Sequence, residues 1–340
     1  MENSKTGPAR PRDRRRVAWA TFAIAVSAAA AVLPHLEIRG IAAIPVAQAL
    51  VPVGAVGLLV LAGVSLVLRS WTAAAAFVLG AVISAIPTFT PVHAGAGAGC
   101  EVRTSATILS FNAKFADADP AALSDLIRDT EPIAVVLLET SEPLIDAVLT
   151  EHGLAEALPH RSREVSPGPA SGSVILSAYP LSDEEDVPGS AFDQVSAVAT
   201  VPGAGDVRIA AVHPPPPVWQ PNAWRDGLDD IAGWVRDTPD ETLIVAGDFN
   251  ASFAHPALRR LAAGLRSGTE AAGPIPWPTW PEEKAIPAFT AIDHIFSRGA
   301  TPLEWSTVAI AGSDHRAVIT GWGLCAAQSI GVFLGSDDAD

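Results

Sequence analysis

Cysteine and positive charge are both scarce in this chain. Its 340 residues include 2 cysteines, and 22 Lys and Arg stand against 37 Asp and Glu, for a formal net charge of −15. From Cys100 onward the imbalance is 34 acidic to 14 basic residues. Because proteins hold the phosphate backbone of nucleic acids with Lys and Arg, this composition disfavours DNA or RNA as a partner without excluding either.

The two cysteines, Cys100 and Cys325, bracket the acidic part of the chain. If the first and last strands of this part pair in antiparallel fashion, the two thiols meet at one end of the ladder. An extracytoplasmic location would then permit a disulfide. Two unconnected thiols are an equal alternative, because a sequence does not give distances.

Charge is absent altogether from three stretches near the N-terminus. Residues 17–34, 40–68 and 71–99 contain no Asp, Glu, Lys or Arg, and each reaches the roughly 20 residues that a membrane-spanning helix needs. We predict three transmembrane α-helices within residues 17–92. A cleaved signal peptide is the alternative for the first stretch, because Arg14, Arg15 and Arg16 precede an alanine-rich segment of suitable length.

Basic residues gather before the first of these stretches, and by the positive-inside rule they place the N-terminus in the cytoplasm. Three crossings then place the chain after about residue 100 outside, in a multi-pass protein of the cell membrane. We expect a disordered basic arm at 1–16, a small-residue linker at 93–102 and an acidic tail at 326–340. The basic residues are Lys5, Arg10, Arg12, Arg14, Arg15 and Arg16.

Residues 103–325 carry strand and helix patterns in alternation. Asp119 and Pro120 mark the start of a helix, and apolar residues at helical spacing predict two more at 222–236 and 255–265. The order favours a mixed α/β domain with two packed sheets flanked by helices, and the acidic run 183–186 is expected to be a solvated turn. Strands are predicted at 107–111, 133–138, 173–178, 197–201, 207–213, 243–246, 291–296 and 317–321.

Polar residues follow the ends of several of these strands, where a sheet delivers side chains to its rim. Leu243–Ala246, for example, is apolar and β-rich, and Asp248 and Asn250 come directly after it. Both could serve only as turn residues. Glu139 is harder to explain in that way, because a carboxylate after a buried run needs a cation or hydrogen-bond donors. The full set is Asn112, Glu139, His213, Asp248, Asn250, Asp293, Asp314 and His315.

Seven short motifs together contain these residues, and the motifs and their order along the chain resemble those of the endonuclease/exonuclease/phosphatase (DNase I-like) superfamily. The resemblance covers about residues 103–323. The three charge-free stretches also resemble a bacterial membrane-anchored branch of this superfamily. The resemblance implies a four-layer α-β-β-α sandwich and a metal-dependent hydrolase of phosphate esters. The motifs are Ser110–Asn112, Leu137–Thr140, Ser171–Ser177, Val212–His213, Gly247–Asn250, Ile292–His294 and Gly312–His315.

The chemistry of phosphate ester hydrolysis suggests a metal site. Mg²⁺, with Mn²⁺ as an alternative, takes oxygen ligands, which assigns Glu139 and the Asn112 carbonyl to the metal, with Asp314 as a further contact. The sequence departs from the family at Leu138, where Gln is common, so a hydrogen bond that supports Glu139 is expected to be missing.

Roles for the other polar residues follow from the chemistry and from the resemblance. By resemblance Asp248 activates the attacking water and Asp293 orients His315. Asn250 would contribute an amide N–H toward the phosphoryl oxygens. His213 and His315 would donate hydrogen bonds when protonated, a form that a neighbouring carboxylate favours.

Two further residues have two interpretations each. Lys114 could reach a substrate phosphate or remain a solvated loop residue. Trp280, within Pro278–Pro281, resembles part of a substrate-side loop of the membrane-anchored branch, and a packing role is an equal alternative.

The leading functional hypothesis is a membrane-tethered, extracytoplasmic phosphoesterase acting on small or lipid-linked phosphate esters or pyrophosphates. An acidic domain on a short linker meets lipid headgroups far more often than free polymer. The runner-up is an extracytoplasmic nuclease acting on DNA or RNA, whose expected mark is a basic groove with stacking aromatics. A third hypothesis is an inactive hydrolase-fold receptor or scaffold, since a fold alone does not establish activity.

Overall fold

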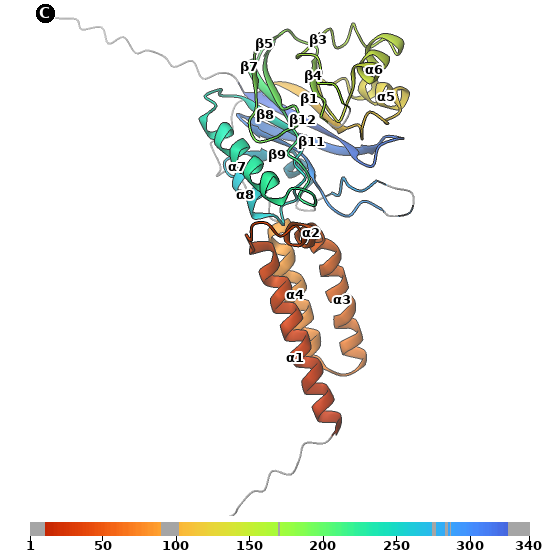
Figure 1. Cartoon of the computed structure of the whole chain (residues 1–340), viewed down its shortest axis with the longest axis vertical. Helices are drawn as coiled ribbons and strands as arrows, with labels where there is room; N and C mark the ends of the chain where they lie inside the picture. Colours follow the sequence, from red (N-terminus) through yellow and green to blue (C-terminus); the bar gives the residue numbers. More distant parts are fainter. Residues whose placement is uncertain are drawn as a thin grey trace, which may run out of the picture.

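A computed structural model of the chain describes residues 11–89, 102–168, 171–273, 277–282, 285 and 287–325. The N-terminal residues form a bundle of helices, and the residues from 102 onward form a globular domain at one end of that bundle (Figure 1). Cys100, the acidic tail, residues 93–101 of the predicted linker and residues 1–10 of the predicted basic arm lie outside the described residues. Residues 11–16 of that arm are helical, so the prediction of disorder is wrong for them.

Small apolar residues pack the N-terminal bundle together. It consists of α1 (Pro11–Val32), the 3-10 turn η1 (Leu33–His35), α2 (Ala43–Ala49), α3 (Val51–Val67) and α4 (Trp71–Phe89). Ala23 of α1 and Phe77 of α4 are fully buried, and Trp19 Nε1 donates a hydrogen bond to Ser65 Oγ at 3.0 Å. Most large side chains on the outer faces of these helices stay exposed.

Among the described residues, two helical segments are long and apolar enough to cross a membrane: Arg14–His35 and Trp71–Thr88. The stretch predicted as the second span divides into α2 and α3, which meet at an angle of 66°. Pro52 lies in the first turn of α3, where a proline cannot continue a preceding helix. The prediction of three separate spanning helices is therefore not confirmed, because a third span requires that α2 and α3 count as one.

The globular domain contains two six-stranded sheets. Their strand orders are β11-β12-β1-β2-β4-β3 and β5-β6-β7-β8-β10-β9. The first sheet comprises β1 (Val102–Asn112), β2 (Ala134–Leu138), β3 (His160–Arg161), β4 (Ser173–Ser177), β11 (Ala300–Ala309) and β12 (Arg316–Cys325). The second comprises β5 (Leu181–Asp186), β6 (Val195–Val201), β7 (Gly205–Val212), β8 (Leu243–Asp248), β9 (Arg266–Ser267) and β10 (Asp293–Arg298).

Alternating side chains of the central strands build three apolar layers. Ile108 of the first sheet and Ile244 of the second both belong to the core between the two sheets. Leu109 belongs to the apolar layer between the first sheet and its helices, and Val245 belongs to the layer between the second sheet and its helices. This alternation is the period of two expected of strands. The outer helical elements are α5 (Pro120–Thr130), α6 (Glu142–Asp146) and η2 (Ala147–Glu151) on one side, and α7 (Pro221–Asp237) and α8 (Pro256–Leu261) on the other, with η3 (Gly268–Ala272) after β9. The domain is thus a mixed α/β sandwich of the kind the motifs suggested.

Strand pairing agrees with the expected closure of the domain. The first strand, β1, pairs in antiparallel fashion with the last, β12, and Val102 lies opposite Cys325. Cys325 is disulfide-bonded, and Cys100 lies outside the described residues.

The prediction that residues 183–186 form a solvated turn is wrong, because they belong to the edge strand β5. Arg208 of β7 binds the carboxylates of Asp183 and Glu185, which holds this acidic strand in the sheet.

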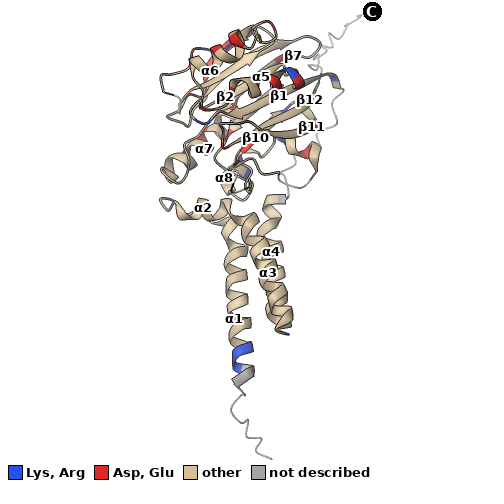
Figure 2. Ribbon diagram, turned by 90° about the vertical axis from the view of Figure 1, so that its right-hand side faces the viewer, with Lys and Arg blue, Asp and Glu red and all other residues tan. Residues whose placement is uncertain are grey.

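The connection between α1 and α2 contacts the globular domain directly. Arg39 forms an ion pair with Asp226 at 2.7 Å, and Arg259 donates to the Pro34 carbonyl at 2.7 Å. Glu37 pairs with Arg260 of α8. Figures 1 and 2 place α2 between the long helices α1, α3 and α4 and the globular domain, with α7 and α8 above it. The helices are therefore docked onto one face of the domain by several polar contacts.

Candidate active site

The strand ends gather the predicted polar residues at one edge of the two sheets. Asn112 is the last residue of β1 and Glu139 follows β2, which runs parallel to β1. In the second sheet His213 follows β7, and Asp248 ends β8, which is parallel to β7. Because the carboxyl ends of parallel strands meet at the same edge, these four side chains converge although they are far apart in sequence.

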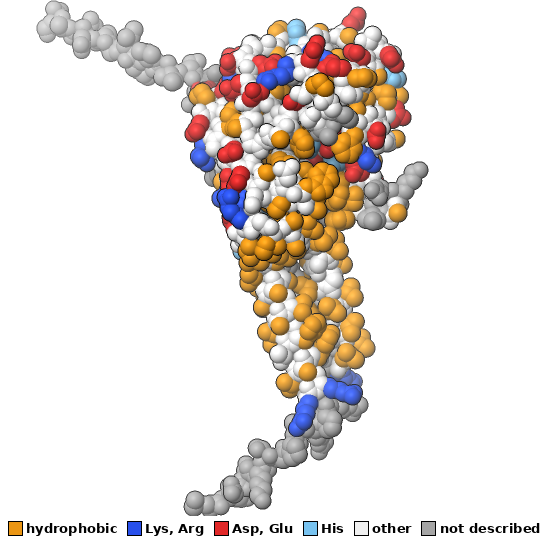
Figure 3. Space-filling view, viewed as in Figure 1, with side chains coloured by type: hydrophobic (Ala, Val, Ile, Leu, Met, Phe, Trp, Pro, Cys, Tyr) orange, Lys and Arg blue, Asp and Glu red, His pale blue; other side chains and the backbone are white. Residues whose placement is uncertain are grey.

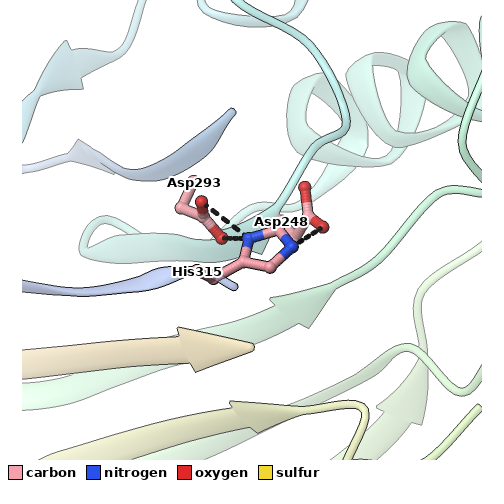
Figure 4. Close-up of side chains that lie close together, drawn as sticks. All are labelled: Asp248, Asp293 and His315. Atoms are coloured by element: carbon pink, nitrogen blue, oxygen red, sulfur yellow. Dashed lines mark hydrogen bonds and ion pairs between the residues drawn. The ribbon is translucent and has the colours of Figure 1, made fainter. Parts of the chain in front are cut away.

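Register in the β8–β10 ladder places Asp248 opposite Asp293. His315, directly before β12, lies between the two carboxylates (Figure 4). Its Nδ1 is 3.0 Å from each oxygen of Asp293, and its Nε2 is 3.8 Å from Asp248 Oδ2. Burial opposes a charge on the ring, yet Asp293 and Asp248 together raise the pKa of His315. The imidazole is therefore held in the charged form, as expected from the sequence.

Asp248 is almost completely buried, with 1 % of its surface exposed. Its Oδ1 accepts the backbone N–H of Asn250 at 2.8 Å, and its Oδ2 accepts from Asn112 Nδ2 at 3.1 Å. Burial and the nearby Asp293 carboxylate raise the pKa of Asp248. The fixed hydrogen bonds leave this carboxylate in one orientation, facing the two histidines.

Glu139 and Asn250 both have a left-handed backbone, with φ of 47° and 49°. This conformation is uncommon for residues other than glycine and clusters at functional sites. At Glu139, Oε1 accepts from Asn112 Nδ2 at 3.1 Å and Oε2 accepts from the Phe115 N–H at 3.0 Å. Asn250 Nδ2 donates to the Pro214 carbonyl at 3.1 Å, so one of its two amide hydrogens is engaged away from the cluster.

His213 differs from His315 in its protonation. Its Nε2 is 3.7 Å from Glu139 Oε1 and 3.8 Å from Asp248 Oδ2, yet burial, with a smaller contribution from the charged His315, lowers the pKa of His213 to about 3. The expectation that a neighbouring carboxylate keeps this histidine charged is therefore not met, because burial and the charged His315 both disfavour a second charge here. A neutral ring still donates one hydrogen bond.

The donor set of this cluster fits a divalent cation. The buried carboxylates of Asp248 and Asp293 and the partly buried one of Glu139 lie near one charged imidazole. Burial raises the pKa of Glu139, as it does that of Asp248. Oxygen ligands of this kind suit a hard cation, and its charge would offset the excess of negative charge. The side chain of Glu139 is the most exposed of the three, with an exposed fraction of 16 % against 2 % for the side chains of Asp248 and Asp293.

Two predicted ligands present themselves differently from expectation. Asn112 directs its amide nitrogen at the carboxylates, while Oδ1 accepts the Lys114 N–H at 2.9 Å, so its carbonyl would reach a cation only after the amide turns over. Asp314 Oδ2 accepts from Trp280 Nε1 at 3.2 Å.

A second group of possible metal ligands consists of Asp248, Asp293 and His315, whose ligand atoms lie within 4.8 Å of one another. Both ring nitrogens of His315, however, already face carboxylates. We therefore place the candidate cation site at Glu139.

A cavity of about 520 Å³ opens onto this cluster. Eight of the predicted residues line it, whereas Asn112 and Asp293 lie behind its surface. Lys114 is half-buried at the wall, and Trp280 packs edge-to-face on Phe289 with ring centroids 6.1 Å apart. The eight are Lys114, Glu139, His213, Asp248, Asn250, Trp280, Asp314 and His315.

Supporting residues that the sequence did not single out hold the cluster in place. Ser313 Oγ donates to the Asn112 carbonyl at 2.8 Å and accepts the His315 N–H at 3.0 Å. Thr279 Oγ1 accepts the Asp293 N–H at 3.2 Å, and Gln194 Oε1 accepts the His213 N–H at 2.7 Å. Ser313 and Thr279 lie within recognised motifs and could have been found there, whereas Gln194 has no signal in the sequence.

Comparison with family models identifies one match. The model described as the Endonuclease/Exonuclease/phosphatase family matches residues 109–315, a range that contains every polar residue of the cluster. Among curated proteins, none matches the chain.

Several solved structures share the fold of the globular domain. Humanized TDP2 from D. rerio, carrying 14 mutations, has a TM-score of 0.53 at 17 % identity, over 64 % of this chain and 98 % of that one. An endonuclease/exonuclease/phosphatase from Beutenbergia cavernae has a TM-score of 0.51 at 19 % identity, over 66 % and 72 %. One from Bacteroides vulgatus has 0.51 at 15 %, over 65 % and 99 %. At these identities the likeness concerns the fold alone.

Proposed function

Because the chain belongs to the endonuclease/exonuclease/phosphatase family, whose model matches residues 109–315, we propose that it is a membrane-tethered phosphoesterase that depends on a divalent metal ion. Its substrates are small or lipid-linked phosphate esters or pyrophosphates. The observation that carries the proposal is the convergence of Glu139, Asp248, His213 and His315 on one cavity.

The residues of the cluster have distinct tasks in such a reaction. A Mg²⁺ or Mn²⁺ ion at Glu139 would neutralise the non-bridging oxygens of the phosphate. Asp248, fixed by Asn112 and the Asn250 N–H, orients an attacking water and accepts its proton. Charged His315, held by Asp293, and neutral His213 donate hydrogen bonds to the phosphoryl oxygens as negative charge develops there.

The arrangement of the helices supports an extracytoplasmic domain. Arg14, Arg15 and Arg16 lie in the first turns of α1, at the end of the bundle farthest from the domain (Figures 2 and 3). If this basic end is cytoplasmic, as the positive-inside rule favours, the domain lies on the opposite side of the membrane. A disulfide at Cys325 is in keeping with an oxidising location.

Charge at the cavity supports a small or lipid-linked substrate over a nucleic acid. Lys114 is the one Lys or Arg among the described residues that line the cavity, whereas binding of nucleic acid strands calls for a basic groove. An inactive scaffold would have no need of buried carboxylates beside left-handed backbone at Glu139 and Asn250.

Hydrolysis by the full chain in phospholipid nanodiscs tests the proposal. Inorganic phosphate and alcohol release would be followed over a panel of lipid, inositol and nucleotide phosphates in Mg²⁺. Glu139→Ala and Asp248→Ala should each abolish the activity, and Asp237→Ala, which removes an exposed carboxylate of α7, should leave it intact. Activity that survives both substitutions in the cluster would contradict the proposal.

A further inference from the structure

One wall of the active-site cavity does not belong to the globular domain. Pro45, Val46 and Ala49 of α2, together with Leu50, line the same cavity as Glu139 and Asp248. Helix α2 leads directly into α3, within the segment that could form the third membrane span. The membrane part of the chain is therefore a component of the cavity rather than a tether alone.

Helix α2 is fixed on two sides, so that its apolar side chains remain at the cavity. Gln48 Nε2 donates to the carbonyls of Leu33 and Leu36 at 2.9 Å each, which ties α2 to the two ends of η1. On the other side His255 Nε2 lies 2.9 Å from the Pro45 carbonyl. Val46 and Leu50 are left 38 % and 41 % exposed.

A proline-rich segment provides more apolar lining from the globular domain. Pro216, Pro217, Val218 and Trp219 line the cavity, and Val218 and Trp219 are 54 % and 70 % exposed. Consecutive prolines restrict the backbone, and Pro217 is buried, so this segment holds Val218 and Trp219 in place although both are exposed. We call Val46, Leu50, Val218 and Trp219 the apolar wall.

We propose that the apolar wall binds the hydrocarbon chain of a membrane lipid whose phosphate group lies at Glu139 and Asp248. The inference rests on the proposed function and names its substrate class: phosphate esters or pyrophosphates that carry an alkyl, acyl or prenyl chain. Val46, Leu50, Val218 and Trp219 select such substrates by chain length.

Three observations favour a lipid chain as the occupant. The apolar wall and the catalytic cluster share one cavity, whose volume of about 520 Å³ lies in the range of pockets that enclose a small ligand. The wall is exposed and apolar, a surface that soluble proteins keep small unless it binds something. Hydrophobic side chains also continue from the helices onto the adjoining face of the domain (Figure 3), so a chain can pass from bilayer to cavity.

Two substrate series test chain-length selection in the full chain, held in phospholipid nanodiscs with Mg²⁺. Alkyl phosphates report through release of inorganic phosphate, and p-nitrophenyl alkyl phosphates report through p-nitrophenol, each with ethyl, butyl, hexyl or octyl chains. Full burial of a methylene group corresponds to a factor of roughly four in kcat/KM. Because the wall is open on one side, we expect a rise of roughly 30-fold or more from ethyl to octyl.

The double variant Val46→Asn/Leu50→Asn should reduce this octyl-to-ethyl ratio to about 5 or less. Leu303→Asn is the matched control, because Leu303 is 47 % exposed on β11, outside the cavity, and it should keep the full ratio. Equal rates along the series in the unmodified chain would overturn the inference while the proposed function stands. Absence of hydrolysis in both series, and of octyl pyrophosphate assayed beside them, would overturn the proposed function and the inference with it.

Photochemical labelling provides a readout that does not depend on turnover. An octyl phosphate with a diazirine at the end of its chain is irradiated with the full chain, and labelled peptides are mapped by mass spectrometry. We expect adducts within residues 43–50 and 216–219 that octyl phosphate suppresses and ethyl phosphate does not. Adducts confined to the outer faces of α1, α3 and α4 and unaffected by octyl phosphate would contradict the inference.

Discussion

The two sides of the cavity are built on different principles. The polar side stands on strand ends, where ladder register and buried hydrogen bonds fix each group, as in the Asp248–Asp293 pair and the contacts of Asn112. The apolar side stands on a helix of seven residues docked through Gln48 and His255. If the polar side carries the chemistry and the apolar side selects the substrate, as proposed, changes on the two sides should have different effects on activity.

The largest effect should come from removal of the proposed metal ion. Treatment of the full chain with a chelator should abolish hydrolysis of every substrate, because Glu139 and Asp248 then face the phosphate without a compensating charge. Mg²⁺ or Mn²⁺ should restore the activity in proportion to its concentration. Unchanged turnover after chelation, with metal content checked by elemental analysis, would refute a metal site in this cluster.

Substitution of Asp248, the carboxylate proposed to activate the water, comes next. Asp248→Asn keeps the size of the side chain but removes the proton acceptor, so kcat should fall by about 10³-fold for short and long chains alike. The octyl-to-ethyl ratio should not move, which separates this change from those on the apolar wall. Circular dichroism checks that the fold persists, and a selective loss on long chains alone would argue against the assigned role.

Asp293→Asn should have a smaller effect, since Asp293 acts through His315. The Nδ1 contacts at 3.0 Å would lose their charge, the pKa of His315 would fall, and activity should drop by roughly 10²-fold. Because His315 would then lose its proton at lower pH, the alkaline limb of the pH profile should shift to lower pH. A profile that keeps its alkaline limb would show that Asp293 does not control this histidine.

The smallest expected effect concerns the docking of α2. Burial lowers the pKa of His255 from 6.5 to about 4, so between these values the unfolded chain binds a proton that the folded chain does not. Stability should therefore be complete above about pH 6.5 and fall as the pH approaches 4, by up to about 3 kcal/mol from this group.

His255→Gln, which retains a donor for the Pro45 carbonyl without titrating in this range, should flatten that dependence. Thermal unfolding between pH 7 and 4.5 measures it, with His160→Gln as the control at a half-buried histidine. His213 and His294 also have lowered pKa values, so the informative quantity is the difference between variant and unmodified chain. An identical pH dependence of the thermal stability in the variant and the unmodified chain would show that His255 does not contribute to it.

Much of the polar side could be predicted from the sequence, because its information is local. Short apolar β-rich runs end at Asn112, Glu139, His213 and Asp248, and such runs place the following residue at a sheet edge. The order of the motifs then suggested the fold. The protonation of His213 could not be predicted, because it depends on burial by elements distant in the sequence.

The apolar side was not predicted, for two physical reasons. A charge-free stretch such as residues 40–68 has the same composition whether it forms one straight helix or two helices at an angle, so composition does not predict a bend. The bend near Pro52 places α2 at the wall of the cavity. The docking role of His255 also had no signal in the sequence, because its partner is the backbone carbonyl of Pro45, 210 residues away. A contact between a side chain and a backbone carbonyl far away in the sequence cannot be predicted from the pattern of residue types, because every residue has that carbonyl.

A crystal structure of the full chain with Mn²⁺ and octylphosphonate tests the central claim most directly, because anomalous scattering locates the ion and the electron density locates the chain. The account predicts an ion coordinated by Glu139, phosphonate oxygens facing His213 and His315, and the octyl chain against Val46, Leu50, Val218 and Trp219. An ion bound elsewhere, with the phosphonate outside the cavity and the octyl chain away from α2, would contradict it.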